Sequence, residues 1–127
     1  MASSPAAPAG PLRILYVEDN PIVREVTSEL LAQEQRQIVA LATAEEALHE
    51  FNTQSFDVVI TDVSLPVMSG LDLARSILSI KPEAPIIIAS GYPLTAVLDY
   101  LGPNVRTIVK PFEAREIDSL IMDLCAA

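Results

Sequence analysis

Short runs of hydrophobic residues alternate along the chain with segments in which hydrophobic residues recur every three or four positions. Runs of five or six residues that are rich in Ile and Val are typical of β-strands, whereas the longer period is typical of helices with one buried face. Strands are expected at residues 12–17, 37–41, 56–61, 85–89 and 105–109. The fourth run is apolar at consecutive positions, which indicates a parallel strand covered on both faces.

Capping signals separate these runs from the helical segments. Asn20 and Thr43 each stand directly before such a segment and can accept hydrogen bonds from its first amide groups, and Ser69-Gly70 precedes a third segment. Helices are therefore expected from 21 to about 35, from 44, after Ser69-Gly70 to a stop at Lys81-Pro82, at about 94–101, and near the C-terminus. Five strands alternating with five helices imply an α/β fold with a doubly wound parallel sheet.

Length and composition indicate how much of the chain folds into a domain. The chain has 127 residues, of which 50% are hydrophobic and 20% charged, so one domain with a full core is expected and wholesale disorder is not. Residues 1–11 contain several Pro and Ala residues and no hydrophobic period, so we interpret them as a flexible linker. A frayed terminus is an alternative. Residues 12–127 then form the domain.

Charge and cysteine content exclude some functions. Eight Lys and Arg against 17 Asp and Glu give a net charge of −9, which argues against nucleic-acid binding by this domain. The single cysteine, Cys125, allows no intrachain disulfide and fits a reducing cytoplasm. No apolar run approaches the ~20 residues of a membrane span, so no membrane contact is expected.

Polar residues follow four of the five expected strands. They are Glu18 and Asp19 after the first, Asp62 after the third, Ser90 after the fourth and Lys110 after the fifth. The carboxyl ends of parallel strands meet at one edge of such a sheet, where ligands bind. Three carboxylates at one edge repel each other, and a hard divalent cation such as Mg²⁺ relieves that repulsion. Zinc is disfavoured because His49 and Cys125 lie elsewhere.

An aspartate whose charge is screened by a metal ion can act as a nucleophile and become an aspartyl phosphate. An ammonium group and a hydroxyl group nearby can bind the oxygen atoms of the phosphoryl group. Asp62, Lys110 and Ser90 are the residues that could take these roles.

Four motifs in this order resemble the receiver domains of two-component response regulators, including those of hybrid sensor histidine kinases. They are Val17-Glu18-Asp19-Asn20, Thr61-Asp62-Val63-Ser64-Leu65-Pro66 followed by Met68-Ser69-Gly70, Ala89-Ser90-Gly91-Tyr92, and Lys110-Pro111-Phe112. Each motif alone is weak, but the ordered set is specific and covers about residues 12–124. The resemblance implies a flavodoxin-like (βα)5 fold with strand order 2-1-3-4-5.

The resemblance also implies roles for individual residues. Asp62 corresponds to the phosphoacceptor, and Glu18 and Asp19 would hold Mg²⁺ together with Asp62 and the backbone carbonyl of Ser64. Ser90 corresponds to the switch hydroxyl, Lys110 to the phosphate-binding lysine, and Pro111 to a cis-proline. Such a domain is a signalling phosphoacceptor whose only expected activities are its own phosphorylation and dephosphorylation.

One position departs from the family pattern. Relatives usually carry Tyr or Phe three residues before the lysine, where this chain has Thr107. A conventional aromatic switch is therefore not expected, and Tyr92, two residues beyond Ser90, is a candidate to replace part of it.

The expected partner is a histidine kinase or a histidine phosphotransfer domain, docking through residues 20–26 and the loop after Lys110. We expect the terminal receiver of a hybrid kinase because a Pro/Ala-rich segment precedes Leu12 and no output domain follows residue 127.

Two alternatives remain open, and a third is weaker. A haloacid-dehalogenase-like phosphatase would need a second Asp where Ser64 stands, and a degenerate receiver would act without phosphorylation. A nucleotide-binding module lacks the Gly-rich loop after the first strand.

Overall fold

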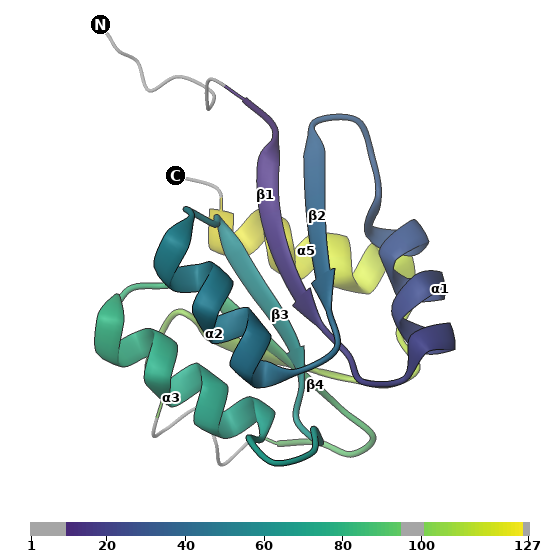
Figure 1. Cartoon of the computed structure of the whole chain (residues 1–127). Helices are drawn as coiled ribbons and strands as arrows, with labels where there is room; N and C mark the ends of the chain where they lie inside the picture. Colours follow the sequence, from purple (N-terminus) through teal and green to yellow (C-terminus); the bar gives the residue numbers. More distant parts are fainter. Residues whose placement is uncertain (1–9, 95–100, 126–127) are drawn as a thin grey trace, which may run out of the picture.

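The computed structural model describes residues 10–94 and 101–125. Its elements, in chain order, are β1 (Leu12–Val17), α1 (Pro21–Leu31), β2 (Arg36–Leu41), α2 (Ala44–Thr53), β3 (Val58–Asp62), α3 (Gly70–Ile80), β4 (Ile86–Ser90), β5 (Val105–Val109) and α5 (Ala114–Cys125) (Figure 1). Apart from its end residues, the helix expected at 94–101 lies outside the described residues. No helix in the described part has the length and hydrophobicity needed to cross a membrane.

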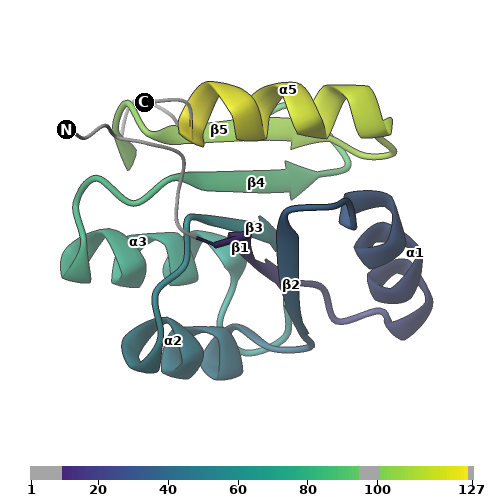
Figure 2. The same ribbon diagram turned by 90° about the horizontal axis from the view of Figure 1, so that it is seen from above.

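All five strands are parallel and lie in the order β2-β1-β3-β4-β5, which confirms the expected flavodoxin-like topology. Helices α2 and α3 cover one face of the sheet, and α1 and α5 cover the other (Figure 2). The chain reverses its winding direction at β1, so the loops after β1 and β3 lie side by side at the carboxyl edge. In an open sheet this is the place where ligands bind.

The two faces of β1 show why its sequence is almost continuously apolar. Leu15 and Val17 pack in the core cluster that includes α2 and α3, whereas Ile14 and Tyr16 pack in the cluster that includes α1 and α5. A strand that is covered on both faces buries side chains on each face, as Ile14, Leu15, Tyr16 and Val17 do here, so period-two alternation between polar and apolar residues is lost.

Two boundaries differ from the sequence prediction in ways that matter for the site. The strands β3 and β4 each extend to the polar residue that was expected to follow them, Asp62 and Ser90 respectively. Asp62 lies opposite Ala89 and Ser90 lies opposite Val109 in the strand ladders. Both polar residues are therefore held by the sheet rather than by a loop.

Helix α1 is shorter than predicted, because it ends at Leu31 rather than near residue 35. Ala32 has an extended backbone, and its amide group bonds the carbonyls of Ser28 and Glu29. Gln35 then has a φ of 70°, which a right-handed helix cannot contain. The start of α1 is as predicted: the Asn20 side chain accepts hydrogen bonds from the first amide groups of the helix.

Candidate functional site

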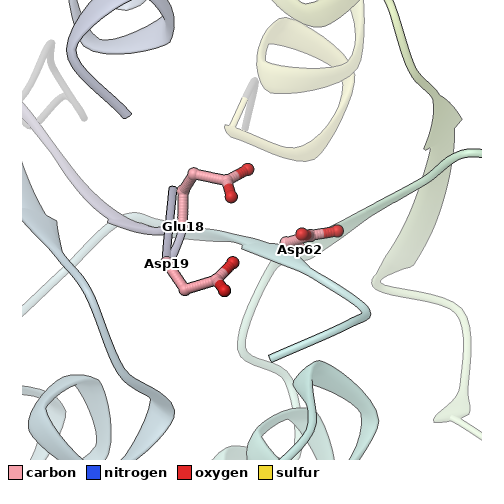
Figure 3. Close-up of side chains that lie close together, drawn as sticks. All are labelled: Glu18, Asp19 and Asp62. Atoms are coloured by element: carbon pink, nitrogen blue, oxygen red, sulfur yellow. The ribbon is translucent and has the colours of Figure 1, made fainter. Parts of the chain in front are cut away.

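Three carboxylates meet at the carboxyl edge of the sheet. Glu18 and Asp19 are adjacent residues of the loop after β1, and Asp62 is the last residue of β3 (Figure 3). One oxygen atom of each lies within 4.8 Å of the others. Glu18 and Asp62 are buried and Asp19 is exposed, so the cluster is accessible from solvent on one side.

Lys110 brings a positive charge to two of these carboxylates. Its Nζ lies 3.1 Å from Oε1 of Glu18 and 3.3 Å from Oδ2 of Asp62. The Lys110 backbone is tied to the end of β4, because its amide group donates to the carbonyl of Ser90 at 2.7 Å. The Lys110–Pro111 peptide bond is cis. Partial burial lowers the pKa of Lys110, but the hydrogen bond with Glu18 and the charges of Asp62 and Glu18 outweigh this effect and raise it. The ammonium group therefore stays charged at neutral pH.

Several contacts fix the loop that carries the acidic pair. The amide group of Glu18 donates to the carbonyl of Leu41 at 3.0 Å, and Oε2 of Glu18 accepts from the amide group of Asn20 at 3.1 Å. Glu18 thus uses one carboxylate oxygen for Asn20 and the other for Lys110. Its side chain is held at both ends of the carboxylate group.

Tyr16, the residue before the last one of β1, lies in the core. Burial raises its pKa to about 12, and the nearby charges of Glu18 and Asp62 act in the same direction, while a hydrogen bond with Thr27 and the charge of Arg24 oppose them. The negative charges of the acidic site therefore help to keep the buried Tyr16 phenol neutral.

The remaining predicted residues, Ser64, Ser90, Tyr92 and Thr107, are not members of the carboxylate cluster. Ser90 is buried at the end of β4, and its Oγ accepts from the amide group of Tyr92 at 3.1 Å. The Tyr92 side chain is exposed. Ser64 is exposed in the loop after β3, and Thr107 is half-buried within β5, opposite Ile88.

The two soft metal-binding side chains are away from this edge. His49 is exposed on α2. Cys125, at the end of α5, has its Sγ 3.7 Å from the carbonyl of Asp57, just before β3 begins. Carboxylate oxygens are the donors at the carboxyl edge, and a cluster of oxygen donors fits a hard cation such as Mg²⁺ better than zinc.

The sequence pattern assigned no role at the site to two residues that the structure places there. Arg24 of α1 donates to the backbone carbonyl of Glu18 at 2.8 Å. Gly70, the first residue of α3, packs against the backbone of Asp62. For Gly70 a signal was available, because glycine is a poor helix former and its presence in a helical segment suggests close packing. Nothing in the sequence pattern distinguished Arg24 from a surface arginine.

The model of the response regulator receiver domain family matches residues 14–122. The chain belongs to this family. Family membership favours the receiver interpretation over the phosphatase alternative, and the carboxylate cluster fits the phosphorylation site of such a domain. Receiver domains accept phosphoryl groups from histidine kinases or phosphotransfer proteins.

Relatives of known sequence include the response regulator protein FleR of Pseudomonas aeruginosa, which is 33% identical over 86% of this chain. The chemotaxis protein CheY of Thermotoga maritima is 29% identical over 85% of this chain. The chain spans only 24% of the length of FleR but 93% of that of CheY. Relatives of this receiver domain therefore differ in what, if anything, accompanies the domain.

A solved structure with the same fold is the response regulator TrrA of Thermotoga maritima, determined in complex with Mg²⁺ and BeF. It is 32% identical, superimposes with a TM-score of 0.80, and the match covers 89% of this chain and 98% of TrrA.

Proposed function

We propose that Asp62 accepts a phosphoryl group from a phosphohistidine in a reaction that depends on Mg²⁺. The observation that carries this proposal is the meeting of three carboxylates with the ammonium group of Lys110 at one edge of the sheet. An Asp62 carboxylate oxygen attacks phosphorus, the bond between phosphorus and the histidine nitrogen breaks, and the imidazole takes up a proton. Later attack by water returns the free carboxylate and inorganic phosphate, which is the only hydrolysis we expect of this domain.

The side chains divide the work. Glu18, Asp19 and Asp62 would hold Mg²⁺, with the backbone carbonyl of Ser64 as a further oxygen donor, and the ion would screen negative charge as the phosphoryl group approaches. Lys110 contacts Asp62, so its ammonium group can donate a hydrogen bond to an oxygen of a phosphoryl group attached to Asp62. The hydroxyl group of Ser90 can donate to another phosphoryl oxygen.

The start of α1 offers a docking surface for the phosphohistidine donor. Ile22 and Val26 lie four residues apart, so they share one face of the helix, and both are largely exposed. This face follows directly after the acidic loop. We propose that a helix of a histidine kinase or phosphotransfer domain packs here, together with the loop after Lys110.

Labelling with acetyl phosphate and Mg²⁺ tests the acceptor. The mass of the wild-type domain is expected to rise by one phosphoryl group, and Asp62→Asn should abolish this increase. Asp72→Asn is a matched control, because Asp72 is an exposed aspartate on α3 that pairs with Arg75. Labelling of Asp62→Asn at the wild-type rate would refute the proposal, and steady hydrolysis of external phosphate esters would support the phosphatase alternative.

The docking surface needs a separate comparison. Ile22→Asp is expected to slow transfer from a phosphohistidine donor while leaving labelling by acetyl phosphate unchanged, because acetyl phosphate needs no helix contact. Ile80→Asp places the same charge on an exposed isoleucine at the end of α3, and it should change neither reaction. Equal effects of the two substitutions on transfer would contradict docking at α1.

Origin in a hybrid sensor kinase, a cytoplasmic location and the boundary between a linker and the domain at residue 12 stay predictions.

A further inference from the structure

The carboxylates of Glu18 and Asp19 differ in the contacts that fix them. The carboxylate of Glu18 is fixed by Lys110 and by the amide group of Asn20. For the carboxylate of Asp19, no hydrogen bond or ion pair occurs within residues 10–94 and 101–125, and the residue is exposed. The place of Asp19 relative to Asp62 therefore depends on the backbone that carries it.

Arg24 is the side chain that holds this backbone. Its Nη1 donates to the carbonyl of Glu18 at 2.8 Å and approaches the carbonyl of Asp19 at 3.5 Å, at the long limit of a hydrogen bond. A guanidinium group has several donors in a rigid plane, so it suits two neighbouring carbonyl oxygens.

Helix α1 places Arg24 where it can reach these carbonyls. The amide group of Arg24 bonds the carbonyl of Asn20 at 2.9 Å, and the Asn20 side chain caps the same turn. The loop after β1 and the first turn of α1 are thus joined by the cap on one side and by the guanidinium group on the other.

We propose that Arg24 is a positioning residue for the metal site: it fixes the backbone of Glu18 and Asp19 so that their carboxylates are arranged for Mg²⁺ before the ion arrives. The inference rests on the proposed function of the site. Residues that orient metal ligands without touching the metal commonly affect metal affinity by about 10-fold or more.

The charge of Arg24 makes the sign of the effect informative. A guanidinium group near three carboxylates repels a divalent cation, so removing its charge alone would tighten Mg²⁺ binding. Removing an anchor of the ligands would weaken it. Weaker binding after loss of Arg24 is therefore evidence for positioning, since electrostatics acts in the opposite direction.

Three variants separate these effects. Arg24→Met removes the guanidinium group and keeps an unbranched side chain, whereas Arg24→Lys keeps the charge and one donor group. Arg75→Met is the control for net charge, because Arg75 is an exposed arginine on α3 whose partner is Asp72. The dissociation constant for Mg²⁺, measured by calorimetric titration of the full chain, is expected to rise about 10-fold in Arg24→Met. It should rise less in Arg24→Lys and stay unchanged in Arg75→Met.

Two further readouts exclude a general loss of structure. In the metal-free protein, amide signals of Glu18, Asp19 and Asn20 should shift in Arg24→Met while those of the core strands stay in place. Labelling by acetyl phosphate should need more Mg²⁺ but reach nearly the wild-type rate at saturation. If Arg24→Met does not fold, the smaller rise of the Mg²⁺ dissociation constant in Arg24→Lys tests the inference instead.

An unchanged or lower dissociation constant for Mg²⁺ in a folded Arg24→Met variant would overturn the inference, as would slower labelling at an unchanged Mg²⁺ requirement. Wild-type protein that neither binds Mg²⁺ nor becomes labelled would contradict the proposed function itself.

Discussion

A Cβ atom at Gly70 would lie 2.1 Å from the carbonyl oxygen of Asp62 and 3.0 Å from the Cα of Val63. The first turn of α3 therefore packs against the backbone of the proposed phosphoacceptor, at a distance that only glycine allows. The amide group of Gly70 adds a hydrogen bond to the carbonyl of Val63 at 3.0 Å. The loop after β3 is closed by this contact, which fixes the end of the strand.

Replacing Gly70 by alanine should destabilise the domain by about 1–3 kcal/mol, because the atoms that the new methyl group meets belong to the backbone and cannot rotate away. Helix propensity alone would stabilise by up to ~1 kcal/mol, so the sign of the change identifies the contact. Unfolding by denaturant measures the change in the free energy of unfolding. Gly91→Ala is the control, since a Cβ there meets nothing within 4 Å. Equal stability of the two variants would contradict the close packing, and labelling of Asp62 should be slowed only in Gly70→Ala.

Loss of Lys110 should have the opposite effect on metal affinity from loss of Arg24. The ammonium group of Lys110 lies on carboxylate oxygens of Glu18 and Asp62, so it competes with a cation for the same atoms. Lys110→Met should tighten Mg²⁺ binding about fivefold, equivalent to about 1 kcal/mol for a partly exposed ion pair. Calorimetric titration measures this change. Lys81→Met removes the same charge from the exposed end of α3 and should leave the affinity unchanged. Weaker binding in Lys110→Met would show that the lysine organises the carboxylates instead.

Tyr16 should make the domain less stable at alkaline pH. Its pKa is raised from 10.0 to about 12 in the folded protein, so folding favours the neutral phenol. The stabilisation is complete below pH 10 and is lost as the pH rises through about 12. The two-unit difference corresponds to about 2–3 kcal/mol.

Unfolding of the wild type and of Tyr16→Phe, measured from neutral pH to about pH 12, tests this effect, because phenylalanine cannot ionise. Between those limits the wild type should lose more stability than the variant. Parallel curves for the two proteins would show that another group causes the alkaline loss.

The carboxyl-edge site could be predicted because its residues follow strands. Hydrophobic runs identify the strands, parallel strands end at one edge, and so Glu18, Asp62 and Lys110 come together although 92 positions separate the first from the last. The strand order itself came from the resemblance to receiver domains, since the hydrophobic pattern alone is compatible with several orders.

The end of α1 and the contacts of Arg24 could not be predicted. Residues 32–35 are Ala-Gln-Glu-Gln, which are good helix formers, so local propensity favours a longer helix than the three-dimensional structure contains. The positive φ of Gln35 turns the chain toward β2, which is a demand of the sheet and not of the local sequence. A long side chain such as Arg24 has many rotamers, and only the folded loop selects the one that reaches the carbonyl of Glu18.

Ser90 provides the test of the switch role that the resemblance to receiver domains implies for its hydroxyl group. Its Oγ accepts a hydrogen bond from the amide group of Tyr92, and within residues 10–94 and 101–125 the hydroxyl group donates no hydrogen bond, so its hydrogen can turn to a new acceptor. A phosphoryl group on Asp62 brings such acceptors, so we expect the Ser90 hydroxyl to turn toward it and the segment after β4 to reorganise. Thr107 is too small to act as the aromatic lever that the resemblance to receiver domains implies at this position, so Thr107→Ala should leave the response unchanged.

Backbone amide spectra with and without beryllofluoride measure this response. Large shifts are expected from Ser90 to Leu101 in the wild type and in Ser90→Thr, which keeps the hydroxyl group. Ser90→Ala should still be labelled at Asp62 by acetyl phosphate but should lose most of these shifts, because the differential contact between the two states of the loop is gone. Tyr92→Ala should reduce the shifts without abolishing labelling. Shifts of wild-type size in Ser90→Ala would refute the role of the hydroxyl group, since the phosphoryl mimic would then reorganise the segment by another contact.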